Sequence, residues 1–170
     1  MAGGRLSRPP RRFKNDQITV RISMNTGTRI FCKTALTFLL AAIIGFLVYT
    51  SIDPRWGGGF WDRFVATHSR LSIPTISALV YWFRKSMHFL GYGTLSLLTW
   101  YYFYLWGFQR SYWPGIILAV LIASLDEYLQ SRVPFRSGKP EDVLLDICGI
   151  VIVTSLTKLF LCRFRLANRD

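Results

Sequence analysis

YWPGIILAVLIASLDEYLQS, residues 112–131, is an apolar run without charge up to Leu125 that then meets the adjacent carboxylates Asp126 and Glu127. A helix of about 20 residues is about 30 Å long, which matches the hydrocarbon core of a bilayer. An ionisable side chain at the centre of the hydrocarbon costs roughly 3 kcal/mol, so such residues usually face a partner or a polar cavity. The stretch therefore predicts a transmembrane helix with a buried polar site near its end.

Three further apolar runs predict three further membrane spans. Residues 35–50 carry no charge, residues 87–106 carry only one histidine, and residues 143–162 carry one acid and one lysine. The chain is 51% hydrophobic and 16% aromatic, whereas a soluble bundle has more polar outer faces. We predict an all-α fold, a multi-pass membrane helical bundle with four transmembrane helices at about 34–52, 86–106, 112–131 and 142–162.

The longest connection, residues 53–85, precedes the second span. It opens with Pro and Gly turn residues and aromatic side chains typical of a membrane interface. Residues 71–83 are apolar but too short to cross a bilayer. Two interpretations stay open: a short interfacial or re-entrant helix, or an extension that merges with the second span into one tilted helix.

The net charge of +12 is concentrated at the N-terminus, because eight of the 21 basic residues lie in the first 33 positions. A basic tail beside a membrane span is typical of a cytoplasmic segment that contacts anionic lipid, so we expect no nucleic-acid partner. Residues 1–30 are expected to form a poorly ordered cytoplasmic tail, and residues 31–165 the membrane domain. With the polar site's own basic residues excluded, the Lys and Arg distribution favours both termini in the cytoplasm and the site on the outer face.

The polar residues near the span ends are expected to lie together, because successive spans cross the membrane in alternating directions. The start of the second span, the end of the third and the start of the fourth must lie on one membrane face, and so must the loop between the third and fourth. We therefore predict one ligand-binding site from these residues: Arg84, Lys85, His88, Tyr92, Asp126, Glu127, Gln130, Arg136, Asp142 and Asp146.

Helical spacing supports this convergence. His88 and Tyr92 are four residues apart, as are Asp142 and Asp146, so each pair shares one face of its helix. Gly149 follows Asp146 by one turn, and a small residue there lets a neighbouring helix approach closely. Three helices are thus expected to turn polar stripes towards one another.

Charges at span ends can also anchor a helix at the interface without a further role. That interpretation stays open for the outermost charges: Lys85, Arg132, Lys139 and Glu141. Asp126, Glu127 and Asp146 lie about a turn further in, where uncompensated acids are costly. For these three the alternatives are a closed ion-pair cluster and a binding or catalytic site.

The polar residues form four motifs in a fixed order. They are Arg84-Lys85-x-x-His88-Phe89-x-x-Tyr92, Ser124-Leu125-Asp126-Glu127-x-x-Gln130, Pro134-x-Arg136-Ser137-Gly138 and Asp142-x-x-x-Asp146-x-x-Gly149. In order and spacing they resemble the VanZ-like family of small bacterial membrane proteins, over about residues 84–155. Two positions depart from that pattern: Phe135 stands where the family often has Gly, and Val153 stands where a second small residue often follows.

The resemblance implies a multi-pass inner-membrane protein of the cell envelope. The family is named for a member associated with low-level resistance to the glycopeptide antibiotic teicoplanin, and it implies no established reaction. Our first hypothesis is a protein that binds a polar or anionic envelope component, such as a lipid headgroup or a lipid-linked glycan. Arg84, Lys85 and Arg136 would contact phosphate, and the acids would orient these bases or bind sugar hydroxyls.

The alternative hypothesis is an intramembrane enzyme, metal-assisted or acid/base, that acts on a lipid-linked substrate. Its catalytic candidates are His88, Asp126, Glu127 and Asp146. One histidine with several carboxylates is a ligand set for a hard or borderline metal, and such a pair can do acid–base work. No HExxH motif is present, so the sequence assigns no metal ligands and leaves the cofactor open.

Overall fold

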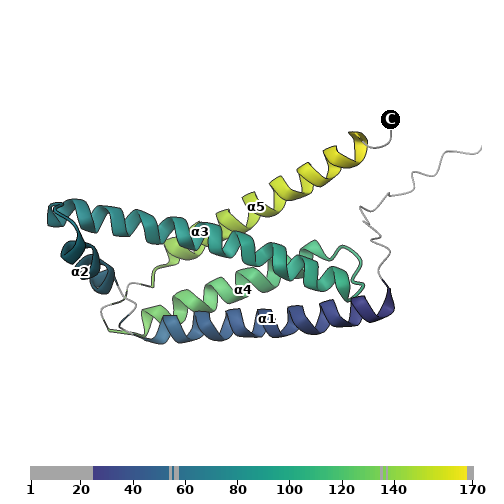
Figure 1. The fold of residues 1–170 in the computed structure, drawn as a ribbon, viewed down its shortest axis with the longest axis horizontal. Helices are drawn as coiled ribbons and strands as arrows, with labels where there is room; N and C mark the ends of the chain where they lie inside the picture. Colours follow the sequence, from purple (N-terminus) through teal and green to yellow (C-terminus); the bar gives the residue numbers. More distant parts are fainter. Residues whose placement is uncertain (1–24, 54, 56–57, 135, 137, 168–170) are drawn as a thin grey trace, which may run out of the picture.

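The computed structural model describes residues 25–167, apart from 54, 56–57, 135 and 137. It contains five helices: α1 (Thr26–Ile52), α2 (Gly58–His68), α3 (Ile73–Leu105), α4 (Tyr112–Ser131) and α5 (Pro140–Ala167) (Figure 1). The described part of the chain has no strand, so the predicted all-α class is confirmed. Residues 1–24, most of the predicted basic tail, lie outside the described residues.

Three helices are long and apolar enough to cross a membrane: α1, α4 and, over Pro140–Phe164, α5. Their bounds contain the predicted spans, although α1 begins at Thr26 rather than near position 34. The Asn25 side chain accepts a hydrogen bond from the Gly27 N–H and caps this earlier start. Residues 26–30, placed in the tail by the sequence, are therefore helical. The second predicted span, residues 86–106, lies almost entirely in α3, and its crossing of the membrane stays a prediction.

The helix α3 is continuous from Ile73 to Leu105, which decides between the two interpretations of residues 71–83. The separate interfacial or re-entrant helix at these positions was wrong: the apolar segment joins the second span. Pro74 lies in the first turn, where proline is tolerated, and no Gly or Pro interrupts the helix between there and His88. With 33 residues, α3 is about 50 Å long and exceeds the hydrocarbon thickness.

The short helix of the connection is instead α2, which the sequence did not predict because Gly58 and Gly59 suggested a turn. Its aromatic side chains hold it against the N-terminal part of α3, with the ring centroids of Trp61 and Phe83 6.5 Å apart. In Figure 1, α2 lies beside the N-terminal end of α3. The exposed faces of Phe60 and Phe64 give α2 the aromatic character of a membrane interface.

The bundle is centred on α3, which packs against α1, α2, α4 and α5. In Figure 1, α1 runs alongside α4 and α5 crosses α3. The core comprises Leu36, Leu40, Tyr92, Leu95, Leu105, Ala119, Ile122, Ala123 and Ile150. Large apolar side chains such as Phe38, Leu121 and Leu159 remain exposed, as expected for faces that contact lipid.

Two glycines bring α3 and α5 together. A Cβ added at Gly149 would collide with the backbone carbonyl of Phe89, and one at Gly93 would lie 2.6 Å from a methyl of Val153. The close approach predicted at Gly149 is thus confirmed. Val153 of α5 stands where the family pattern often has a small residue. At this contact the small residue is Gly93, on the facing helix α3.

Buried hydroxyls join the same helices by hydrogen bonds. The Ser96 and Thr154 hydroxyl oxygens are 2.8 Å apart between α3 and α5. Thr99 donates to the Gly115 carbonyl at 2.8 Å between α3 and α4. Small polar side chains of this kind are a recurrent means of association between apolar helices. Together with the glycines they fix how the three helices present their polar ends.

Candidate functional site

The polar site lies where the end of α1, the middle of α3, the end of α4 and the start of α5 meet. The structure brings the predicted residues together in three groups: one around Asp126, one around His88, and the basic residues Arg84, Lys85 and Arg136 around them. The convergence predicted from helix parity is therefore present, while the function of the residues stays a hypothesis.

Asp126 is 6% exposed and accepts hydrogen bonds from three donors. The Tyr92 hydroxyl donates to its Oδ2 at 2.7 Å and the Gln130 amide donates to the same oxygen at 2.9 Å. The Ser51 hydroxyl donates to Oδ1. These donors come from α3, α4 and α1, and all three side chains are buried. The carboxylate therefore links three helices.

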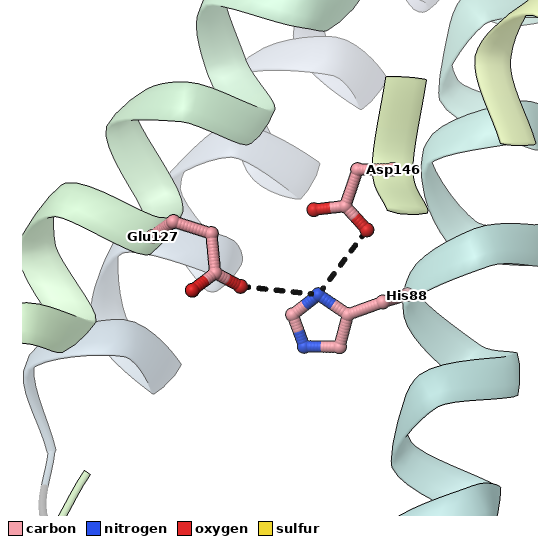
Figure 2. A group of neighbouring side chains, drawn as sticks. All are labelled: His88, Glu127 and Asp146. Carbon is pink, nitrogen blue, oxygen red and sulfur yellow. Dashed lines mark ion pairs between the residues drawn. The ribbon is translucent and has the colours of Figure 1, made fainter. Parts of the chain in front are cut away.

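The second group contains His88, Glu127 and Asp146, one from each of α3, α4 and α5 (Figure 2). The Nδ1 atom of His88 is 3.6 Å from Oε1 of Glu127 and 3.5 Å from Oδ1 of Asp146. Figure 2 shows that this edge of the imidazole faces both carboxylates, whereas Nε2 points away from them. The two acids are 4% and 0% exposed as side chains.

Several polar atoms of this group have no hydrogen-bond partner: His88 Nδ1, Glu127 Oε1 and both carboxylate oxygens of Asp146. The two His88 distances exceed the usual range of an N–H···O bond, about 2.7–3.2 Å. Moreover, a single Nδ1–H cannot be donated fully to two carboxylates. Buried polar atoms are normally satisfied, so this group has an unmet need for positive charge or hydrogen-bond donors.

The loop between α4 and α5 holds the other oxygen of Glu127. Gly138 lies so close to the end of α4 that an added Cβ would collide with backbone atoms of Glu127 and Ser131. This approach places the Lys139 N–H 3.2 Å from Glu127 Oε2, to which it donates. Glycine at position 138 thus lets the loop orient the carboxylate towards His88.

The three basic residues surround the acids but are not equivalent. Lys85 forms an ion pair with Asp142. Arg136 donates through one guanidinium nitrogen to the carbonyls of Thr50 and, at 2.9 Å, Ser51. Arg84 is half-buried and has no ion-pair or hydrogen-bond partner among the described residues. Burial, with a contribution from the charge of Arg84, lowers the pKa of the Arg136 guanidinium, so the two cations share one environment.

The sequence missed the contribution of α1. Ser51 is 1% exposed and donates to Asp126, and the last carbonyls of α1 accept from Arg136. The direction of the spans could have predicted it, because the end of the first span and the start of the second must lie on the same membrane face. The motif residues Phe135 and Ser137, including the departure noted at Phe135, lie outside the described residues.

Chemically, the arrangement can do two things. A histidine between two buried carboxylates can hold or transfer a proton, and the same three groups can coordinate a cation. The nearby guanidinium groups of Arg84 and Arg136 can bind an anion such as phosphate. The site therefore suits a ligand with phosphate, with a cation, or with both.

Fold and site together define an all-helical membrane protein with a buried polar cluster at one end of its bundle. A family model described as VanZ/LLP1 matches residues 35–161, which include most of α1, all of α4 and every residue of the site. The chain belongs to the VanZ/LLP1 family, as its motifs predicted. No curated protein and no solved structure matches it.

Proposed function

We propose that this protein is a four-span inner-membrane protein that binds an anionic component of the cell envelope at the polar site. The ligand would carry phosphate, as a lipid headgroup or a lipid-linked glycan intermediate does. Arg84 and Arg136 would contact the phosphate, and the acids would position the basic groups or bind hydroxyls. The basic residues that precede α1 would contact anionic lipid on the cytoplasmic face.

The observation that supports this proposal is the state of Arg84. It lies one helical turn before His88, is half-buried, and has no partner among the described residues. Its charge also acts on Arg136, whose guanidinium is partly held by the backbone of α1. Two neighbouring guanidinium groups favour an anion between them, and phosphate accepts bidentate hydrogen bonds from Arg.

Replacing Arg84 with Gln is expected to weaken binding of a phosphate-bearing lipid about tenfold, because one charge-assisted contact contributes roughly 1.5 kcal/mol. The measurement is titration of the purified full chain, in nanodiscs of phosphatidylcholine, with undecaprenyl phosphate. Arg63→Gln is the matched control: Arg63 lies in α2, is exposed, and loses the same charge. Equal affinity for wild type and Arg84→Gln would contradict the proposal.

A role in teicoplanin sensitivity is the cellular part of the proposal and rests only on the family resemblance. Expression of the chain in a susceptible host is expected to raise the teicoplanin tolerance of that host. Arg84→Gln at equal protein level is expected to abolish the rise, while Arg63→Gln keeps it. A rise that is unchanged in Arg84→Gln would separate resistance from this site.

The proposed orientation, with both termini in the cytoplasm, places the site at the periplasmic face. Two exposed positions suit single cysteines: Ala66 in α2 and Gln109 between α3 and α4. The proposed topology places them on opposite sides of the membrane. In a chain without its native cysteines, an impermeant maleimide is expected to label Ala66→Cys in intact cells and Gln109→Cys only after lysis. The reverse pattern would invert the topology.

The second candidate, an intramembrane enzyme, is favoured by one observation: His88 Nδ1 faces the carboxylates of Glu127 and Asp146 at about equal distance. Acid–base chemistry at a phosphate or acyl bond would then use His88 as the proton carrier. Incubation of the reconstituted protein with lipid-linked envelope intermediates tests it. Turnover that disappears in His88→Gln would establish the enzyme, and binding without turnover would support the first candidate.

A further inference from the structure

We propose that His88, Glu127 and Asp146 bind one divalent first-row transition cation, such as Mn²⁺ or Zn²⁺. The site would lie inside the bundle, with one ligand atom from each of α3, α4 and α5. This inference does not depend on the phosphate-binding proposal, because it concerns a cation and other side chains.

The geometry of the three ligand atoms fits a metal. One potential ligand atom from each residue lies within 4.8 Å of the other two. His88 Nδ1 is 3.5 Å and 3.6 Å from the two carboxylate oxygens. Two ligands at about 2.1 Å from a tetrahedral metal are about 3.4 Å apart. The two separations from His88 Nδ1 are thus near those of metal ligands and longer than those of hydrogen bonds.

The same atoms that face one another have no hydrogen-bond partner. Both oxygens of Asp146, which is 0% exposed, are unpartnered, as are Glu127 Oε1 and His88 Nδ1. The neighbouring acids differ: Asp126 has three donors, and Asp142 is paired with Lys85. Among the acids of the polar site, the unmet requirement for positive charge therefore falls on Glu127 and Asp146, and one divalent cation meets it.

The donor chemistry selects the class of cation. One imidazole nitrogen with two carboxylate oxygens suits Zn²⁺, Mn²⁺ or Fe²⁺ better than soft Cu⁺. The Lys139 N–H donates to Glu127 Oε2 and so orients Oε1 towards His88, as outer hydrogen bonds do around metal ligands. Three protein ligands leave a further coordination position for water or for an oxygen of a bound ligand.

The test uses the full chain in nanodiscs, stripped with a chelator and then titrated separately with MnCl₂ and ZnCl₂. Bound metal is counted by elemental analysis after removal of free ions. Wild type is expected to retain about one equivalent of at least one metal. Asp146→Asn and Glu127→Gln are expected to weaken its binding at least tenfold, since each removes one of three ligands. Glu141→Gln is the matched control, because it removes an exposed carboxylate from the first turn of the same helix, and it is expected to bind metal as wild type does.

A second measurement separates a metal site from a closed ion pair of His88 with its acids. In the metal-free protein, Asp146→Asn removes a buried, unpartnered charge and is expected to leave the thermal midpoint unchanged or higher. Added metal is expected to raise the midpoint of wild type and not that of Asp146→Asn. A midpoint lowered by Asp146→Asn without metal, with no effect of metal on wild type, would overturn the proposal.

The two proposals fail separately. Arg84→Gln is expected to keep the bound metal while losing the phosphate-bearing lipid, and Asp146→Asn to lose the metal. Equal metal content in wild type, Asp146→Asn and Glu127→Gln would disprove the cation site and leave lipid binding at Arg84 untouched.

Discussion

Asp126→Ala is expected to lower the free energy of unfolding by about 3 kcal/mol. The substitution removes the acceptor shared by Ser51, Tyr92 and Gln130. The buried Tyr92 and Gln130 donors are left without a partner, whereas the Ser51 hydroxyl can still donate to the Leu47 carbonyl. Each such bond contributes roughly 1 kcal/mol, with interhelical bonds in membranes at the lower end and bonds to a charged acceptor at the upper end. Because Ser51 is the last buried residue of α1, the attachment of α1 is expected to weaken first.

The measurement is reversible unfolding of the purified protein in mixed micelles with increasing dodecyl sulfate, followed by circular dichroism. The matched control is Glu141→Ala, which removes an exposed carboxylate from the first turn of α5 and is expected to change the free energy by less than about 0.5 kcal/mol. If Asp126→Ala were as stable as the control, the network around Asp126 would have no structural role.

Gly149→Ala is expected to destabilise the protein by about 1–2 kcal/mol, although alanine is the better helix former. The added methyl group would collide with the carbonyl of Phe89, so α3 and α5 must separate. Such overpacking destabilises a core by roughly 1–3 kcal/mol. The higher helix propensity of alanine relative to glycine offsets this by about 1 kcal/mol at most. His88 directly precedes Phe89 and Asp146 lies one turn before Gly149, so a wider spacing of α3 and α5 is also expected to weaken metal binding.

Gly91→Ala provides the matched control, because Gly91 is in α3, is exposed, and has nothing within 4 Å of an added Cβ. It is expected to be neutral or slightly stabilising by the same unfolding measurement. Equal stability of Gly149→Ala and Gly91→Ala would show that α3 and α5 tolerate a wider separation than the structure has.

Helix parity explains why much of the site was predictable. Three span ends on one membrane face placed His88, Glu127 and Asp146 together without knowledge of any crossing angle, and the structure has them in contact. The same rule places the end of the first span on that face, but the predicted site contained residues of the other three spans only and lacked Ser51. The alternating direction of the spans determines on which membrane face each span end lies. The hydrogen-bond partners of each side chain depend instead on how the helices pack.

Local sequence was less informative about the connection before α3. An apolar segment of 13 residues has the same composition as an interfacial helix or as an extension of the next span. Packing of α2 against Phe83 and its neighbours favours the extension, and it also makes a helix of a segment with two leading glycines. Both outcomes depend on contacts between distant residues. Local propensity does not contain them.

The origin of the site in three separate helices has a consequence for biosynthesis. His88 and Glu127 precede Asp146 in the chain, and Gly149, which brings α5 against α3, follows them. Until α5 is inserted, the chain carries polar groups inside an incomplete bundle, a state that is costly in lipid. Completion of the polar cluster thus requires α5, and a molecule arrested before α5 joins the bundle leaves His88 and Glu127 uncovered on that side.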